Sequence, residues 1–326
     1  MSEQQQYQGD RWTTQSQSIL ENLGWIQKGD SNFDIPCTNK SNHATGQSKE
    51  RKNPHGIDLL FSYYDPFLRK DTGIIVESKH RKWSGISTST IQDFIDQLTM
   101  TIECASLDSK IQDLGCDNVR TGLLMLWCNE PSLFDNSEFK KYLSEIDLKK
   151  RKNPITLYIA SNNEILKWCS IIEKVNEYRG IYEDFKVFYT SDSYSGGLSS
   201  ATRKDYLTLK QLYSSYIFAK GKKNKRVSKD TVTTIDSHHV FFFATPTTDE
   251  LNFMFSYMKR FQFEDADELI IHFYGEQVEY REYISQFIRN KKKAYEKEDS
   301  HLDLKVDYLN RLQDVPENYS QRWGSN

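Results

Sequence analysis

Apolar and polar positions between residues 56 and 82 predict two antiparallel strands joined by a loop. Residues 57–63 form one apolar and aromatic run and residues 73–76 form another, and both have the length of a strand. The segment between them is charged and contains Asp65-Pro66, a pair that is typical of turns. We therefore expect a β-hairpin here.

A symmetric hairpin of this length has its midpoint between positions 67 and 68. That register sets Asp58, at the start of the first strand, opposite Glu77, at the end of the second. Side chains alternate between the two faces of a strand, so Glu77 and Lys79 share a face and Ser78 points to the other. The hairpin is therefore expected to bring two carboxylates and one ammonium group together.

The chain around the hairpin alternates between helical and strand-like patterns. One helix is expected before it, over residues 11–24, where apolar side chains gather on one side. After it, the pattern predicts helices over residues 90–107, 137–146 and 164–178 and strands over residues 121–128, 155–160 and 185–189. This alternation favours a largely parallel extension of the hairpin's sheet, and the expected fold class is α/β, a mixed sheet flanked by helices. A capping box of Ser89 and Gln92 is expected at the start of the second helix.

The stretch SDSYSGGLSS, residues 191–200, is the clearest change in composition along the chain. We place a boundary there, between a first domain over residues 1–195 and a second, smaller α/β lobe over residues 196–326. The lobe is expected to contain helices over residues 200–218, 247–261 and 278–293 and strands over residues 240–244, 269–274 and 302–309. It has no glycine-rich phosphate loop, so we expect it to serve specificity, scaffolding or partner docking.

Composition permits a packed core but does not indicate a partner. The chain has 326 residues, 37% of them hydrophobic, and a formal net charge of −3 at pH 7, so any surface for nucleic acid must be locally basic. No apolar run approaches the roughly 20 residues of a membrane span. The polar N-terminus lacks the apolar segment of a secretion signal. A cytoplasmic protein without membrane contact is expected.

Five scattered cysteines, none in a C-x-x-C pair, are expected to be reduced thiols. Their spacing gives no reason to expect structural zinc. His43 and His55 lie in or beside residues 38–54, a polar stretch that predicts an exposed loop. Neither histidine has a partner at ligand spacing, so both are expected to be surface residues.

The expected grouping of Asp58, Glu77 and Lys79 suits divalent-metal chemistry. Two neighbouring carboxylates repel each other unless a cation lies between them, and Mg²⁺ prefers oxygen ligands and accepts one or two protein carboxylates. A lysine beside the ion can orient or deprotonate a metal-bound water and can neutralise charge that develops on a phosphate. The alternative is a solvated hairpin edge that carries these residues by chance.

The whole pattern resembles the PD-(D/E)XK nuclease superfamily, which includes many restriction and defence nucleases. The resemblance rests on residues 56–58 (GID), on residues 74–79 (IIVESK) and on the helix that follows. Family members often have a proline before the first acid, where this chain has Ile57. The resemblance implies a restriction-endonuclease-like core. In it Asp58, Glu77 and the Ser78 carbonyl hold Mg²⁺ or Mn²⁺, and Lys79 lies beside the nucleophilic water.

The resemblance also suggests accessory residues. Relatives often carry an extra acid on the helix before the hairpin, and Glu21 is the candidate for it. They often bring a polar side chain from the following helix to the metal-bound water, and Gln92 and Gln97 are the candidates. Each of these side chains has an ordinary alternative as an exposed polar residue of a helix.

Two basic segments are candidates for nucleic-acid contact, because arginine and lysine bind phosphates and tryptophan can stack on a base. The first follows the motif directly and comprises His80, Arg81, Lys82 and Trp83. The second, in KGKKNKRVSK, comprises Lys222, Lys223, Lys225 and Arg226. For each segment a solvated surface without function remains the alternative.

We expect a metal-dependent endonuclease that hydrolyses phosphodiester bonds of nucleic acid, with DNA favoured over RNA, in prokaryotic defence or restriction. The resemblance implies products with 5′-phosphate and 3′-hydroxyl ends. One alternative is an inactive nuclease-fold subunit that binds nucleic acid or a partner protein. Another is a nuclease that cuts only as a homo- or hetero-oligomer with a partner subunit, since a free nuclease would endanger its host.

Overall fold

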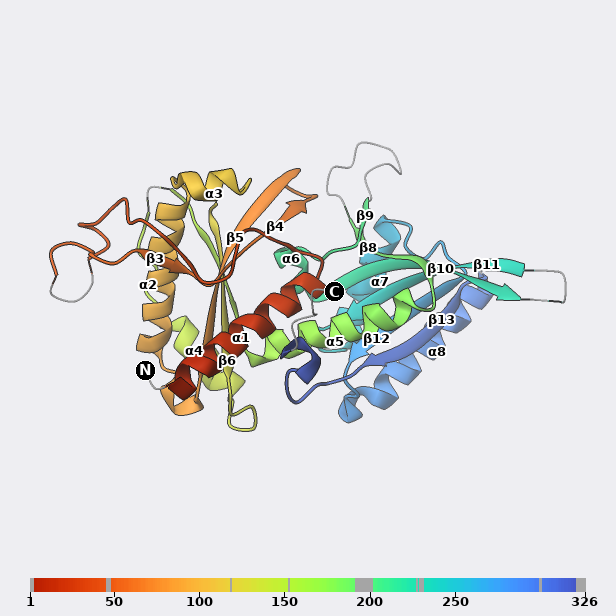
Figure 1. The fold of residues 1–326 in the computed structure, drawn as a ribbon. Coiled ribbons are helices and arrows are strands. Elements are labelled where there is room, and N and C mark those ends of the chain that lie inside the picture. The colour runs from red at the N-terminus through yellow and green to blue at the C-terminus, as the bar shows by residue number, and fades with distance from the viewer. Residues whose placement is uncertain are drawn as a thin grey trace. The chain divides into compact units, whose positions relative to one another are not determined.

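The computed structural model describes residues 3–44, 48–117, 119–151, 153–190, 202–226, 228, 232–298 and 301–320. Two compact units divide the chain (Figure 1). The first comprises Met1–Leu166 and Gln313–Asn326, and the second comprises Lys167–Leu312. Each is built from a sheet with helices, so the α/β class with mixed, helix-flanked sheets is confirmed.

The first unit contains a five-stranded mixed sheet with the strand order β1-β4-β5-β6-β7. Pairing is antiparallel from β1 to β5 and parallel from β5 to β7. The strands are β1 (Ile26–Gln27), β4 (Leu59–Asp65), β5 (Lys70–Arg81), β6 (Thr121–Cys128) and β7 (Thr156–Ala160). A separate antiparallel pair is formed by β2 (Phe33–Ile35) and β3 (His55–Ile57).

The hairpin of β4 and β5 has the predicted register. Leu59 pairs with Val76 and Asp65 pairs with Lys70, which places the midpoint between positions 67 and 68. Asp58 precedes Leu59 in a bend between β3 and β4, so it follows the same register without belonging to either strand. It therefore lies opposite Glu77, as expected.

Helices cover both faces of the first sheet. Their bounds are α1 (Glu3–Asn22), α2 (Thr88–Ala105), α3 (Ser109–Asp113), α4 (Asn136–Ser144) and the start of α5 (Asn162–Arg179), with the 3-10 helices η1 (Trp83–Gly85) and η4 (Glu317–Ser320). Alternate residues of β6 face opposite sides. Leu124 and Leu126 join the core that contains α2, whereas Trp127 stacks on Trp12 of α1 at 5.6 Å between ring centroids.

Close packing and capping fix α2 against β6. A side chain at Gly122 of β6 would place its Cβ 2.7 Å from Ile102 Cδ1, so a larger residue there would force side chains of α2 to shift. The cap of α2 differs from the prediction. Ser87, not Ser89, accepts a hydrogen bond from the backbone N–H of Thr90, so the expected capping box of Ser89 and Gln92 is wrong.

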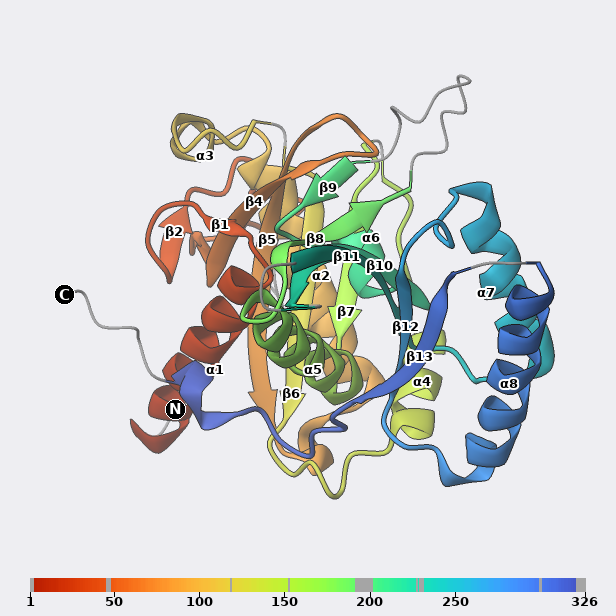
Figure 2. The same ribbon diagram turned by 90° about the vertical axis from the view of Figure 1, so that its right-hand side faces the viewer.

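The second unit contains a six-stranded sheet with the order β13-β12-β11-β10-β8-β9. Its strands are β8 (Glu183–Tyr189), β9 (Thr202–Lys204), β10 (Tyr216–Arg226), β11 (Val232–Phe242), β12 (Glu268–Tyr274) and β13 (Asp303–Leu309). Figure 2 shows α7 (Thr248–Arg260) and α8 (Arg281–Lys297) on one side of these strands and α5 on the other. The short helices are α6 (Leu209–Leu212) and η3 (Val278–Tyr280).

Two expectations for this part of the chain need correction. β8 does not extend the hairpin's sheet. It pairs antiparallel with β10, and its buried aromatic side chains belong to the second unit. The division therefore falls within α5, between residues 166 and 167, and not between residues 195 and 196. All of residues 191–200 lie outside the described residues.

The helix expected over residues 200–218 is also wrong. β10 takes the end of this range and pairs with β11 along its whole length, from Tyr216–Phe242 to Arg226–Val232. Pairing with β8 and β11 outweighs the local helical pattern here, because the apolar run at Ile217 and Phe218 packs into a sheet.

Candidate active site

A backbone hydrogen bond holds Asp58 beside β5. The N–H of Ser78 donates to Asp58 Oδ2 at 2.7 Å. Because Ser78 lies between Glu77 and Lys79, this contact fixes the Asp58 carboxylate next to both side chains. The bend between β3 and β4 thus presents the first acid to the end of the second strand, as the motif predicts.

Lys79 joins the two acids. Its Nζ contacts Glu77 Oε1 and lies 3.7 Å from Asp58 Oδ2. The same ammonium group lies 5.8 Å from the centre of the Phe94 ring on α2. The structure thus brings the three predicted residues together around one positive charge.

Burial and the neighbouring charges shift the pKa values of Glu77 and Lys79. Glu77 is 6% exposed. Its loss of hydration, with the neighbouring Asp58 carboxylate, raises the pKa of Glu77 to about 7 in spite of Lys79. For Lys79, burial acts to lower the pKa, but the two carboxylates outweigh it and raise the pKa above its ordinary value. Two carboxylates therefore share one ammonium group.

A cavity of about 850 Å³ opens at this cluster, lined in part by Asp58, Ser78 and Lys79. His80, Arg81 and Lys82 of the first basic segment line the same cavity. Glu77 is not among the lining residues, because it is buried and its carboxylate is engaged by Lys79. The cavity has the size of a small-molecule or nucleotide site.

Of the accessory candidates, the structure brings only Gln97 to the cavity. Glu21 is exposed and accepts a hydrogen bond from Gln17 at 3.1 Å. Asp10 and Thr13 of α1 line the cavity instead. Thr13 lay inside the expected helix, but Asp10 did not, because α1 begins at Glu3 and not at residue 11. Their i, i+3 spacing, which puts two side chains on one helical face, was the available signal.

Gln92 and Trp83 have structural roles away from the cavity. Gln92 exchanges two hydrogen bonds with the backbone of Asp147, at 3.1 and 2.9 Å, which ties α2 to the segment after α4. Trp83 packs against Phe134 and Tyr142, with ring centroids 5.4 and 6.2 Å apart. The expected stacking of Trp83 on a base is therefore not supported by its position.

The second basic segment forms part of β10 in the second unit. Lys222, Lys225 and Arg226 are exposed, whereas Lys223 Nζ pairs with Glu268 Oε2 at 2.6 Å. The segment is a strand as far as Arg226, so it is not a loop there. Lys223 is largely neutralised, and its exposed neighbours remain candidates for phosphate contact.

The expectation that His43 and His55 are surface residues is wrong. Both are 1% exposed, and both lie next to Cys37 and Cys104. Residue spacing along the chain did not reveal this cluster, because the fourth residue, Cys104, comes from α2, far along the chain.

The donor chemistry at the hairpin fits a hard divalent ion. Asp58 and Glu77 offer carboxylate oxygens, the ligand type that Mg²⁺ and Mn²⁺ prefer. Among the ion pairs of the described residues, these two acids have Lys79 as their common partner. An added cation would favour the ionised form of Glu77 and relieve its repulsion with Asp58.

A comparison with protein families agrees with this geometry. The family model for the PD-(D/E)XK nuclease domain of GAPS4 proteins matches residues 1–164, which contain the whole candidate site. No curated protein matches the chain. Within the described residues, no helix is both long and apolar enough to cross a membrane. The chain therefore belongs to the GAPS4 PD-(D/E)XK nuclease family, a bacterial anti-phage defence family.

Proposed function

We propose that this protein is a Mg²⁺- or Mn²⁺-dependent endonuclease that hydrolyses phosphodiester bonds, with DNA as its preferred substrate. The observation that supports this proposal best is the convergence of Asp58, Glu77 and Lys79 in a nuclease-family domain, beside a cavity that Asp58 and Lys79 line. A solvated hairpin edge with these residues by chance would not bury Glu77 beside a second acid.

The carboxylates of Asp58 and Glu77 and the backbone carbonyl of Ser78 would hold the metal. PD-(D/E)XK nucleases generally use divalent metals, and such an ion polarises the phosphate and supplies hydroxide near neutral pH. The Ser78 N–H keeps the Asp58 carboxylate in place. Burial of Glu77 keeps its carboxylate in one position, which suits a ligand with fixed geometry.

Lys79 provides positive charge where a phosphate would gain negative charge during attack. Its ammonium group lines the cavity and is held by both carboxylates, so it is oriented before substrate arrives. In this position it can donate a hydrogen bond to the attacking water or to a phosphate oxygen. Loss of this group would remove transition-state stabilisation.

Basic residues beside the motif would position the nucleic-acid backbone. Arg81 and Lys82 are exposed and line the same cavity as Asp58. Phosphate contacts of this kind carry no sequence information and weaken as salt rises. The exposed Lys222, Lys225 and Arg226 of β10 are proposed as further phosphate contacts.

We place this activity in the bacterial cytoplasm, in defence, and under the control of a partner subunit. The defence family supports the setting, and control by a partner follows from the danger that a free nuclease poses to its own genome. The second unit is proposed to serve partner docking or specificity, since its sequence contains no phosphate-binding loop.

The test is cleavage of supercoiled plasmid, linear DNA and RNA with Mg²⁺, with Mn²⁺ and with a chelator. The wild-type chain, alone or co-purified with a partner, is expected to cut DNA only with metal and to leave 5′-phosphate ends. Asp58→Asn is expected to give no product, whereas Lys140→Ala, at an exposed lysine of α4, should cut like wild type. Metal-independent cutting, or equal cutting by Asp58→Asn, contradicts the proposal. Binding of DNA without any cutting would favour the inactive subunit.

A further inference from the structure

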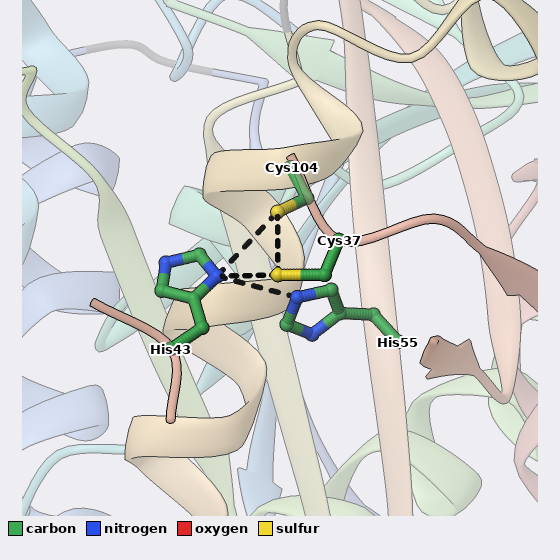
Figure 3. A group of neighbouring side chains, drawn as sticks. All are labelled: Cys37, His43, His55 and Cys104. Atoms are coloured by element: carbon green, nitrogen blue, oxygen red, sulfur yellow. Dashed lines mark hydrogen bonds between the residues drawn. The ribbon is translucent and has the colours of Figure 1, made fainter. Parts of the chain in front are cut away.

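Four side chains of the types that bind metals meet in the first unit, at a place separate from the carboxylate cluster of Asp58 and Glu77. They are Cys37, His43, His55 and Cys104, all buried, with exposed fractions of 8%, 1%, 1% and 0% (Figure 3). Cys104 lies on α2 and His55 begins β3, whereas Cys37 and His43 belong to the chain between β2 and β3. Figure 3 shows the two sulfur atoms and one nitrogen of each imidazole pointing toward a common centre.

The atoms that face this centre are close to one another. His43 Nδ1 lies 3.3 Å from His55 Nε2, 3.4 Å from Cys37 Sγ and 3.5 Å from Cys104 Sγ. The two sulfur atoms are 4.0 Å apart. The ligand atoms of the four residues all lie within 4.8 Å of one another.

These spacings match a tetrahedral metal site. Zinc bonds cysteine sulfur at about 2.3 Å and histidine nitrogen at about 2.0–2.1 Å, so ligand atoms at the corners of such a tetrahedron lie about 3.3 to 3.8 Å apart. Three of the four separations given above lie in that range, and the sulfur–sulfur distance exceeds it slightly.

We propose that Cys37, His43, His55 and Cys104 bind one zinc ion in a structural Cys₂His₂ site. All four coordination positions would be filled by protein, and the site is buried, as in structural rather than catalytic zinc sites. Thiolate and imidazole ligands favour zinc over the Mg²⁺ or Mn²⁺ of the carboxylate cluster. The chain would thus hold two kinds of metal at two separate places.

Hydrogen bonding alone does not account for the cluster. His43 Nε2 lies 2.8 Å from Glu103 Oε2, and a carboxylate accepts, so Nε2 carries the proton. His43 Nδ1 then has one lone pair, yet three neighbours lie within 3.5 Å of it. A cation at the centre would use that lone pair together with those of the other three ligands.

The surroundings of two ligands also fit a metal site. Zinc-bound histidine commonly donates its other ring N–H to a carboxylate, as His43 does to Glu103, which Arg151 also contacts. The backbone N–H and the hydroxyl of Thr38 both lie 3.4 Å from Cys104 Sγ, where they can donate to a thiolate. Nδ1 of His55 is buried without a hydrogen-bond partner among the described residues.

A zinc ion at this site would anchor the segment that leads to Asp58, the first acid of the proposed active site. His55 begins β3, and Asp58 follows the end of that strand. Cys104 fixes the other side of the site to α2, which also carries Gln97 of the cavity. The zinc ion would therefore stabilise the approach to Asp58 without taking part in hydrolysis.

The test is elemental analysis of the full-length chain, purified without metal-affinity chromatography. About one zinc ion per chain is expected in the wild type. Cys104→Ser should lose it, whereas Cys116→Ser, at a buried cysteine of the same unit, should retain it. Asp58→Asn should also retain it, which separates this site from the proposed active site.

Two measurements remain informative if Cys104→Ser does not fold. Cobalt-substituted wild-type protein should show the visible bands of tetrahedral coordination and a thiolate-to-cobalt charge-transfer band. Glu103→Gln, which keeps all four ligands, should bind zinc about ten- to a hundredfold more weakly. A folded wild type that contains no zinc and gives no such cobalt spectrum after reconstitution would overturn the proposal, as would a folded Cys104→Ser protein that retains its zinc.

Discussion

Lys79 supplies the only charge compensation that the two acids of the candidate site receive from an ion pair among the described residues. Replacing it with alanine leaves Glu77 buried beside Asp58 without a cation, which costs stability as well as any catalytic contribution. A metal bound by the two carboxylates would restore part of that stability. Loss of activity in such a variant is therefore meaningful only for protein shown to be folded.

A variant of Asp10 tests how α1 contributes to the proposed active site. Asp10→Asn removes a carboxylate that lines the cavity. We expect it to lower the cleavage rate about ten- to a hundredfold, the usual effect of an outer residue at a metal site. Glu21→Gln, on the same helix but about 16 Å further along its axis, should cut like wild type. Equal rates for the two variants in a plasmid assay would exclude a role for Asp10.

The difference between Asp58 and Cys104 shows which contacts the sequence can predict. Asp58, Glu77 and Lys79 meet through one hairpin, whose two-residue period and symmetry are local properties. The Cys/His cluster depends on Cys104 of α2, which lies 49 positions beyond His55. No local period in the sequence indicates that these two residues meet. Asp10 was missed for a different reason, because the start of α1 carries few apolar residues.

Among strands and helices, predictions failed where the local sequence pattern did not reveal the pairing partner. The strands of the first unit follow one another in the sheet as they do along the chain from β4 to β7, and these were predicted well. In the second unit β10 lies between β8 and β11, and its pairing outweighs the helical pattern of residues 200–218. The assignment of β8 to the first sheet failed because the pattern of the strand itself does not indicate its partner, which is β10.

One carboxylate links four neighbouring strands of the second sheet. Glu268 of β12 binds Lys223 of β10 and Lys305 of β13 at 2.6 Å each, and accepts a hydrogen bond from Ser237 of β11 at 2.9 Å. Burial acts to raise the pKa of Glu268, but these three partners outweigh it and lower the pKa to about 2. The folded state therefore favours the ionised carboxylate.

The lowered pKa of Glu268 predicts how the stability of the Glu268→Gln variant depends on pH. In the folded state the pKa of Glu268 lies below its ordinary 4.5. The ionised carboxylate therefore stabilises the protein fully above pH 4.5, and this stabilisation is lost as the pH falls through about 2. The variant should lose about 1–3 kcal/mol of unfolding free energy at pH 7. Chemical denaturation should show this difference shrinking between pH 4.5 and pH 2. Glu296→Gln, at an exposed position of α8, should change little, and a difference that stays constant with pH would contradict the account.

Considered as a whole, the molecule has a discontinuous first unit. Residues 313–326 belong to it although the family match ends at residue 164. Val315 and Tyr319 are buried, and η4 packs against α1, the helix that brings Asp10 to the cavity. The sequence indicated a single boundary near residue 195, because a returning segment of this length has no distinct composition.

Removal of residues 313–326 should therefore destabilise the first unit. Burial of Val315 and Tyr319 stabilises it by about 2–5 kcal/mol, and α1 would lose that packing. Thermal unfolding followed by tryptophan fluorescence should show a lower midpoint for the truncated chain, since Trp12 of α1 and Trp127 of β6 stack in this unit. An unchanged midpoint would mean that the C-terminal segment does not support α1.

The most direct test of the proposed active site is the single-turnover rate of plasmid cleavage in Mn²⁺ by wild type and by Lys79→Ala, both shown to be folded by circular dichroism. The assigned role of Lys79 predicts a loss of roughly a thousandfold. Equal rates for the two proteins would contradict the assignment of Asp58, Glu77 and Lys79 as the catalytic centre.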